Sequence, residues 1–157
     1  MSSIQSIRGF TLFETLIATG ILITAFAGVA QLFVLSTQLT RQSVRSGAAL
    51  LAAQDKLELL RGARFAYGAD GTAITDAALQ ISPATSLVED LVPYVDWVDE
   101  GGVSGRDETQ AAFVRRWRVS AVGTGAPDAI SIEVCVFTPP GSHPADACLS
   151  TIRSRQP

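Results

Sequence analysis

The sequence contains few of the residues that usually build catalytic or metal-binding sites. It has one histidine, His143, and two cysteines, Cys135 and Cys148. A protein zinc site needs about four such ligands at characteristic spacings, and this set does not supply them. The sequence also lacks the short motifs that mark phosphate-binding loops, nucleophile elbows and zinc hydrolases. We therefore expect no metal, no cofactor and no enzymatic activity.

An excess of positive charge is also missing. The 157 residues include 12 Lys and Arg against 15 Asp and Glu, which gives a formal net charge of -3. Nucleic-acid-binding surfaces are usually basic, so a nucleic-acid partner is not expected. The three arginines Arg115, Arg116 and Arg118 are the one basic cluster that keeps this alternative open. Internal repeats and low-complexity runs are absent, and the length suits one domain plus an anchor.

The segment from Phe10 to Leu35 lacks proline and has a single charged residue, Glu14. A bilayer-spanning helix needs about 20 mostly apolar residues, so this segment is long enough to cross a membrane. A carboxylate inside such a segment is costly and points to a function. Two simpler interpretations stay open: Glu14 and Thr11 have the spacing of a capping box, or Glu14 lies at the depth of the lipid headgroups.

The residues Gly9-Phe10-Thr11-Leu12-Phe13-Glu14 resemble the cleavage and methylation motif of type IV prepilins and type II secretion pseudopilins. In that motif a polar leader ends in glycine, phenylalanine follows, and a glutamate stands five residues after the glycine. An unbroken apolar helix comes next, as it does here. The match covers about Arg8 to Leu35. Many major pilins have a proline inside the apolar segment, and this sequence has none there.

The resemblance implies that residues 1–9 are a leader, cleaved by prepilin peptidase between Gly9 and Phe10. Phe10 would then be N-methylated. Glu14 would serve methylation or assembly, as the opposite charge for the Phe10 amine of a neighbouring subunit. The implied partners are that peptidase, other pilin or pseudopilin subunits, an inner-membrane assembly platform and, before assembly, membrane lipid.

A secretory signal peptide is the main rival interpretation of this segment. The residues Ala25-Phe26-Ala27 resemble a signal peptidase site. The apolar run is, however, longer than the usual apolar region of about 7–15 residues in signal peptides. This interpretation also leaves the motif at Gly9–Glu14 without a role.

Helix-forming residues continue beyond the apolar segment. No proline occurs from Ser36 to Arg64, and Leu50, Ala53, Leu57 and Leu60 recur at helical spacing. The acidic and basic side chains between them fall mostly on the other face; these are Asp55, Lys56, Glu58 and Arg61. We predict one helix from about Phe10 to about Arg64, with a membrane-spanning half (10–35) and an amphipathic half (36–64) that packs on a soluble domain.

The remaining residues, 65–157, predict a small antiparallel sheet. Residues 66–83 read as a loop with a possible short helix at 75–80, and residues 82–93 are ambiguous. Alternating or β-branched patterns predict strands at 94–98, 113–122, 129–137 and 148–155. Arg115 falls on the apolar side of its strand. Turns at 123–128 and 139–144 make this a meander, so the fold class is α+β, with a long N-terminal helix packed on a small antiparallel sheet. This layout resembles pilins, and more loosely the minor pilins of the PilV type and minor pseudopilin I.

Two groups of residues in the sheet domain each allow more than one interpretation. Cys135 and Cys148 flank the second turn, which favours a disulfide over two buried thiols, if the domain lies outside the cytoplasm. A set of carboxylates surrounds a glycine-rich stretch and makes a calcium site a minor alternative to solvated charge or to pairing with the arginines. This set comprises Glu89, Asp90, Asp96, Asp99, Glu100, Asp107 and Glu108.

Together these patterns predict a structural protein: a minor pilin or pseudopilin of a type IV pilus or type II secretion pseudopilus. It would first be a single-pass inner-membrane protein with a periplasmic domain, then part of the pilus (fimbrium) or pseudopilus. One alternative is a membrane-anchored binding module, such as an adhesin or DNA-uptake subunit at a filament tip. Another is a periplasmic enzyme on a simple signal anchor.

Overall fold

The computed structural model describes residues 10–105, 108–123, 128–139 and 144–156. The predicted leader 1–9, with Gly9, lies outside the described residues. So do most of the two predicted turns, with His143, and the carboxylate Asp107. The chain divides into two compact units, one ending at Ser43 and the other beginning at Val44.

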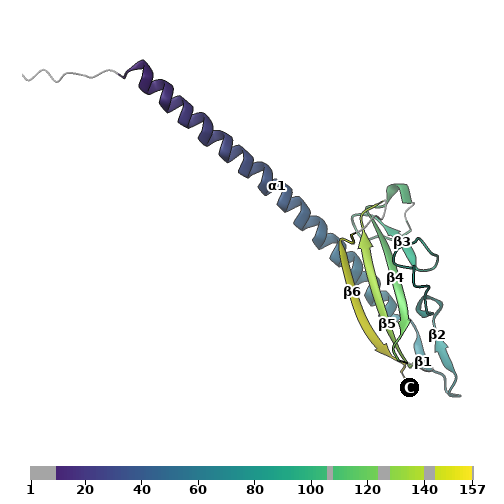
Figure 1. Ribbon diagram of the computed structural model, residues 1–157. Helices are drawn as coiled ribbons and strands as arrows, with labels where there is room; N and C mark the ends of the chain where they lie inside the picture. Colours follow the sequence, from purple (N-terminus) through teal and green to yellow (C-terminus); the bar gives the residue numbers. More distant parts are fainter. Residues whose placement is uncertain (1–9, 106–107, 124–127, 140–143, 157) are drawn as a thin grey trace, which may run out of the picture. The chain divides into compact units, whose positions relative to one another are not determined.

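One long helix, α1, extends from Leu12 to Gly62 (Figure 1). Thr11 begins it, because its Oγ1 accepts a hydrogen bond from the Glu14 N–H at 3.3 Å. No proline interrupts the following 51 residues. The helix stops at Gly62, a residue of low helix propensity. The predicted helix is therefore confirmed, with ends two residues inside those expected.

The end of α1 buries a face made largely of small side chains. Its buried residues are Ala49, Ala52, Ala53, Leu57 and Leu60. Leu50, which we placed on this face, is 40% exposed instead. The alanines explain the difference, because they let the helix backbone approach the sheet closely and turn Leu50 to the side.

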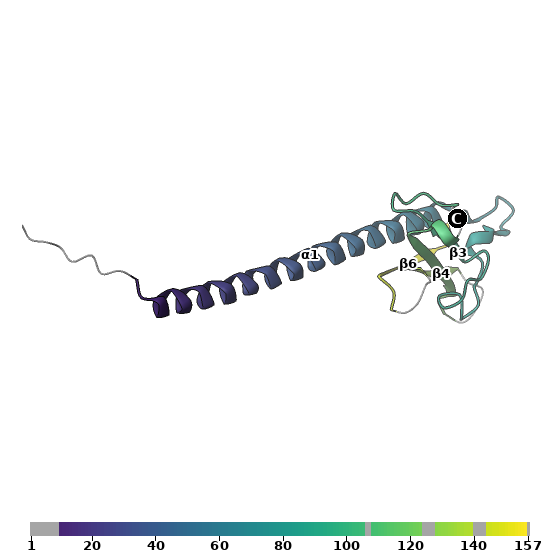
Figure 2. The same ribbon diagram turned by 90° about the horizontal axis from the view of Figure 1, so that it is seen from above.

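A four-stranded antiparallel sheet forms the main layer, in the order β3-β4-β5-β6. The strands are β3 (Val95–Val98), β4 (Phe113–Ala121), β5 (Ala129–Phe137) and β6 (Ala147–Ser154). Each pairs with the next along the chain, which is the predicted meander. The last turns of α1 lie against one face of this sheet (Figures 1 and 2). The predicted α+β arrangement of a long helix on an antiparallel sheet is thus observed.

Both faces of the sheet are covered, and each carries its own core. On the helix face, the alternating residues of β5 meet α1; these are Ile130, Ile132, Val134 and Val136. The opposite face buries Val95, Val114, Cys135 and Phe137, with Leu87 packed against them. The ambiguous segment 82–93 therefore supplies part of the second cover. Two hydrogen bonds hold its beginning against β4: the Ser82 N–H donates to the Val119 carbonyl oxygen, and the Val119 N–H donates to the Ser82 hydroxyl.

Short elements occupy the region that we read as loop. β1 (Phe65–Tyr67) and β2 (Ala73–Thr75) form a two-stranded antiparallel sheet. A 3-10 turn, η1, follows at Ala77–Leu79, where a short helix was possible, and η2 lies at Glu108–Gln110. Strands of three residues are too short to show an alternating pattern, so the loop prediction was wrong there.

Candidate functional site

The residues of the motif Gly9–Glu14 that the structure describes lie at the start of α1 and directly before it. Phe10, Thr11 and Glu14 are all exposed. The Glu14 N–H bonds to Thr11, which is half of a capping box. The other half would be a hydrogen bond that the Thr11 N–H donates to the Glu14 carboxylate, and none occurs among the described residues. The Glu14 carboxylate is therefore available to a group outside the described chain.

From Phe10 to Leu35 every side chain is exposed, including large apolar ones. Phe13 is 72% exposed and Phe33 is also 72% exposed. The helix is long and apolar enough to span a membrane, by length and composition. Its threonines suit an apolar environment, because their hydroxyls donate to backbone carbonyls one turn back, as Thr24 does to Ile21 at 2.8 Å. A continuous exposed apolar surface of this kind is typical of a segment that contacts lipid or other proteins.

A buried charged cluster joins α1 to the sheet. Arg115 on β4 donates from Nε to Asp96 Oδ1 at 2.7 Å and from Nη2 to Asp96 Oδ2 at 2.9 Å. Lys56 on α1 donates to the same Oδ2 at 2.9 Å. Arg115 Nη1 also donates to the carbonyl oxygen of Ala52 at 3.2 Å. One carboxylate on β3 thus holds a helix cation and a strand cation together.

The electrostatics of this cluster favour the ionised carboxylate. Burial raises the pKa of Asp96, but the hydrogen bonds and charge of Arg115, and then those of Lys56, outweigh it, so that its pKa lies below the usual value. The Lys56 ammonium also lies 3.7 Å from the centre of the Trp117 ring, which is a cation–π contact. The arrangement ties α1 to the sheet through Asp96.

The position of Lys56 corrects our assignment of that residue to the outer face. Its side chain is only 14% exposed. The aliphatic part of a lysine can lie along apolar surface while its ammonium reaches a carboxylate, and Asp96 provides one. The sequence signal was its spacing, four residues after Ala52 and four before Leu60, which are both buried.

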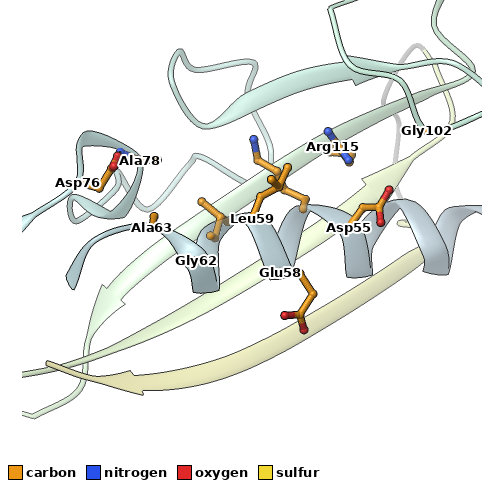
Figure 3. A pocket seen from close by; sticks show the side chains of 11 residues that line it. Asp55, Glu58, Leu59, Gly62, Ala63, Asp76, Ala78, Gly102 and Arg115 are labelled. Carbon is orange, nitrogen blue, oxygen red and sulfur yellow. The ribbon is translucent and has the colours of Figure 1, made fainter. Parts of the chain in front are cut away.

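A groove of about 930 Å³ runs beside the end of α1. In Figure 3, Asp55, Glu58 and Leu59 project from the helix, Arg115 lies beyond it, and Asp76 and Gly102 stand at opposite ends. Its open side carries carboxylates, whereas its two cations, Lys56 and Arg115, are already paired with Asp96. The groove therefore offers acidic and apolar contacts.

The other two arginines of the trio are also paired within the domain. Arg116 is buried and donates to Asp90 at 2.8 Å, and Arg118 donates to Glu133 at 2.6 Å. The expected pairing with the acidic set therefore holds for Arg115 and Arg116, while the partner of Arg118 comes from β5. Within the described ranges no three His, Cys, Asp or Glu side chains are grouped closely enough to hold a metal ion.

Cys135 and Cys148 form a disulfide between β5 and β6, with an S–S distance of 2.07 Å. The two residues are directly opposite each other in the strand register. Cys135 is buried, while Cys148 is exposed. The bridge that the sequence allows is therefore present, and it joins the edge strand to the centre of the sheet.

Arg153 on β6 holds the end of α1 from a direction that the sequence did not suggest. Its Nη1 donates to the carbonyl oxygens of Leu60 at 2.8 Å and Ala63 at 3.0 Å. The last carbonyls of a helix lack partners within it, and a cation at this end also complements the helix dipole. The contacts join residues 93 and 90 positions apart, so local patterns could not reveal them.

Comparison with protein-family models, curated proteins and solved structures found no match to this chain.

Proposed function

We propose that this protein is a minor pilin or pseudopilin, a subunit of a type IV pilus or type II secretion pseudopilus. Prepilin peptidase cleaves it after Gly9, and Phe10 becomes the methylated N-terminus. The protein waits in the inner membrane with its sheet domain in the periplasm. Its α1 then packs among the helices of other subunits, at an inner-membrane assembly platform, to build the filament.

The observation that carries this proposal is the motif Gly9–Glu14 directly before an uninterrupted apolar helix. The motif places a carboxylate on the first turn of a segment whose apolar surface is fully exposed. An ionised group in that setting is costly unless an opposite charge neutralises it. The Phe10 amine, released by cleavage, supplies such a charge on a neighbouring subunit. The pair then acts as a register device between helices.

The arrangement of the sheet domain agrees with a structural role. Its polar clusters hold α1 to the sheet through Asp96 and Arg153, and they are satisfied within the domain. Such clusters hold the sheet domain on the end of the helix. This suits a subunit that assembles through that helix.

The test is the mass of the N-terminal peptide of the membrane-bound protein, with active and with inactive prepilin peptidase. We expect a chain that starts at methylated Phe10 only when the peptidase is active. A start at Met1 or Ser2 in both strains would make the segment a plain signal anchor. A start just after Ala27 would make the domain a secreted protein, and either result would overturn the proposal.

The groove beside α1 favours a second candidate, an anchored binding module at a filament tip. Ala78→Trp would place a bulky side chain in the groove from η1. A binding module predicts normal filaments that no longer attach to a surface or take up DNA. Ala84→Trp, outside the groove, serves as the matched control.

A further inference from the structure

Four charges on α1 are exposed and poorly matched within the chain. Arg41 and Arg45 are exposed and have no ion-pair partner among the described residues, and the same holds for Asp55. Among the described residues Glu58 pairs with Arg61, one turn away and also exposed. Exposed pairs of this kind contribute little, so Glu58 can exchange its partner at small cost.

The spacing of these charges fits a second copy of the same helix. Arg41 and Asp55 are 14 residues apart, which is close to four turns of about 3.6 residues. Two parallel copies shifted by 14 residues, about 21 Å at 1.5 Å per residue, therefore bring Arg41 of one opposite Asp55 of the other.

The same axial shift also brings a second pair of opposite charges, Arg45 and Glu58, together. Arg45 comes four residues after Arg41, which turns it by about +40° around its helix, and Glu58 comes three residues after Asp55, which turns it by about -60°. When two parallel helices face one another, a clockwise turn around one axis and an anticlockwise turn around the other lead to the same side of the interface. The opposite rotations of Arg45 and Glu58 therefore place both residues on that side. Arg45 of one copy then meets Glu58 of the other.

The surface around Asp55 suits an arginine side chain. Leu51 and Leu59, one turn before and one turn after Asp55, are 65% and 64% exposed. They offer apolar contact to the aliphatic part of the incoming arginine. Asp55, Glu58 and Leu59 also line the groove of about 930 Å³, which leaves room for a guanidinium group.

We propose that the acidic face of α1, formed by Asp55 and Glu58, binds Arg41 and Arg45 of a second copy of this chain. The contact rests on the proposed function, because copies held at one depth in a bilayer have no axial shift. It forms only after one copy has advanced about 21 Å along the helix axis relative to the other. The pairing therefore distinguishes assembled from membrane-stored subunits.

The test is cysteine cross-linking in cells that carry the assembly machinery, with two differently tagged full-length versions. One version has Arg41→Cys and the other has Asp55→Cys. We expect a mixed dimer of the two versions in the sheared filament fraction, absent when the peptidase is inactive. Gln54→Cys, one residue from Asp55 on the helix, replaces Asp55→Cys in the matched control and is expected to cross-link at least fivefold less.

Charge reversal tests the attraction between Arg41 and Asp55 in chains without introduced cysteines. Arg41→Glu or Asp55→Arg alone should lower incorporation into filaments about fivefold, and both together in one chain should restore it to within about twofold. Three results would overturn the contact while filaments still form: no mixed dimer, a dimer of Arg41→Cys with itself only, or cross-links to other proteins only. Absence of filaments despite correct cleavage at Phe10, or absence of that cleavage, would overturn the proposed function and this contact with it.

Discussion

At the scale of single residues, the fold depends most on Arg115, whose side chain is 2% exposed. Removal of one partner from a buried ion pair leaves an uncompensated charge, which typically costs about 3–5 kcal/mol. We expect Arg115→Met to lower the free energy of unfolding by about that amount, because Asp96 keeps only Lys56 and the Ala52 carbonyl loses a donor. Denaturant unfolding of the detergent-solubilised chain measures this.

Arg118 provides the matched control for Arg115. It lies three positions along the same strand and pairs with Glu133. This pair is more exposed, because the Arg118 side chain is 41% exposed and that of Glu133 is 33% exposed. Exposed pairs contribute about 0–1 kcal/mol, so Arg118→Met should have a small effect. Equal losses for the two variants would mean that the buried cluster has no special role in stability.

The pKa of Asp96 gives a second prediction at this scale. Because its pKa is lowered in the folded state, the ionised carboxylate adds stability above its usual value of about 4. That stability is lost as the pH falls through the lower, folded pKa. The wild-type advantage over Asp96→Asn should therefore be full at pH 6 and shrink as the pH falls below about 4. Unfolding measured across this range in both proteins checks it; a constant difference would rule out the linkage.

At the scale of elements, the disulfide anchors the edge strand β6 to β5. It closes a loop with a sequence separation of 13 residues, for which constraint of the unfolded chain contributes about 3 kcal/mol. We expect the Cys135→Ala, Cys148→Ala double variant to lose about this much stability. Dithiothreitol should destabilise the wild type by a similar amount and leave the double variant unchanged. A wild type indifferent to the reductant would show that the bridge does not restrain the chain.

The end of α1 is held by a side chain from another element, Arg153 on β6. Arg153 donates to the carbonyl of Leu60 in the last turn of α1 and to that of Ala63 directly after it, and hydrogen bonds from charged groups contribute about 1.5–3 kcal/mol each. Arg153→Leu should speed amide exchange in residues 59–63 about tenfold or more and leave the centre of β5 protected. Arg61→Gln, which removes an exposed pair on the same turn, should change neither. Unaltered exchange in Arg153→Leu would mean that packing alone holds the helix end.

The elements also mark the limit of what sequence patterns could predict. The long helix and the strands β4 and β5 were predictable because their patterns are long. The short strand β3 and the weakly patterned β6 could be placed because each follows or precedes a turn and pairs with its neighbour in sequence. The pattern also placed Arg115 correctly on the apolar side. Lys56 and Arg153 could not be assigned, since their partners Asp96 and Leu60 come from distant segments. β1 and β2 were too short to show a pattern.

At the scale of the whole molecule, the apolar half of α1 leaves every side chain from Phe10 to Leu35 exposed in the single chain. Its carboxylate, Glu14, is the one ionisable group from Phe10 to Leu35. We expect Glu14→Ala to leave membrane insertion intact, because it removes a charge from an apolar segment. It should reduce filament incorporation at least tenfold, because the amine of Phe10 on a neighbour loses its partner in a setting of low dielectric constant.

The capping role of Glu14 predicts a different pattern of variants. Thr11→Val removes the hydroxyl that accepts the Glu14 N–H, but keeps the carboxylate. If helix capping were the function of this turn, Thr11→Val would impair assembly as strongly as Glu14→Ala. If the carboxylate pairs with a neighbouring amine, Thr11→Val assembles nearly normally, and Glu14→Gln, which keeps size but not charge, fails like Glu14→Ala. Immunoblots of membrane and sheared filament fractions for the three variants decide between the two roles. Normal incorporation of Glu14→Gln would reject the charge pair, since an amide cannot neutralise the amine.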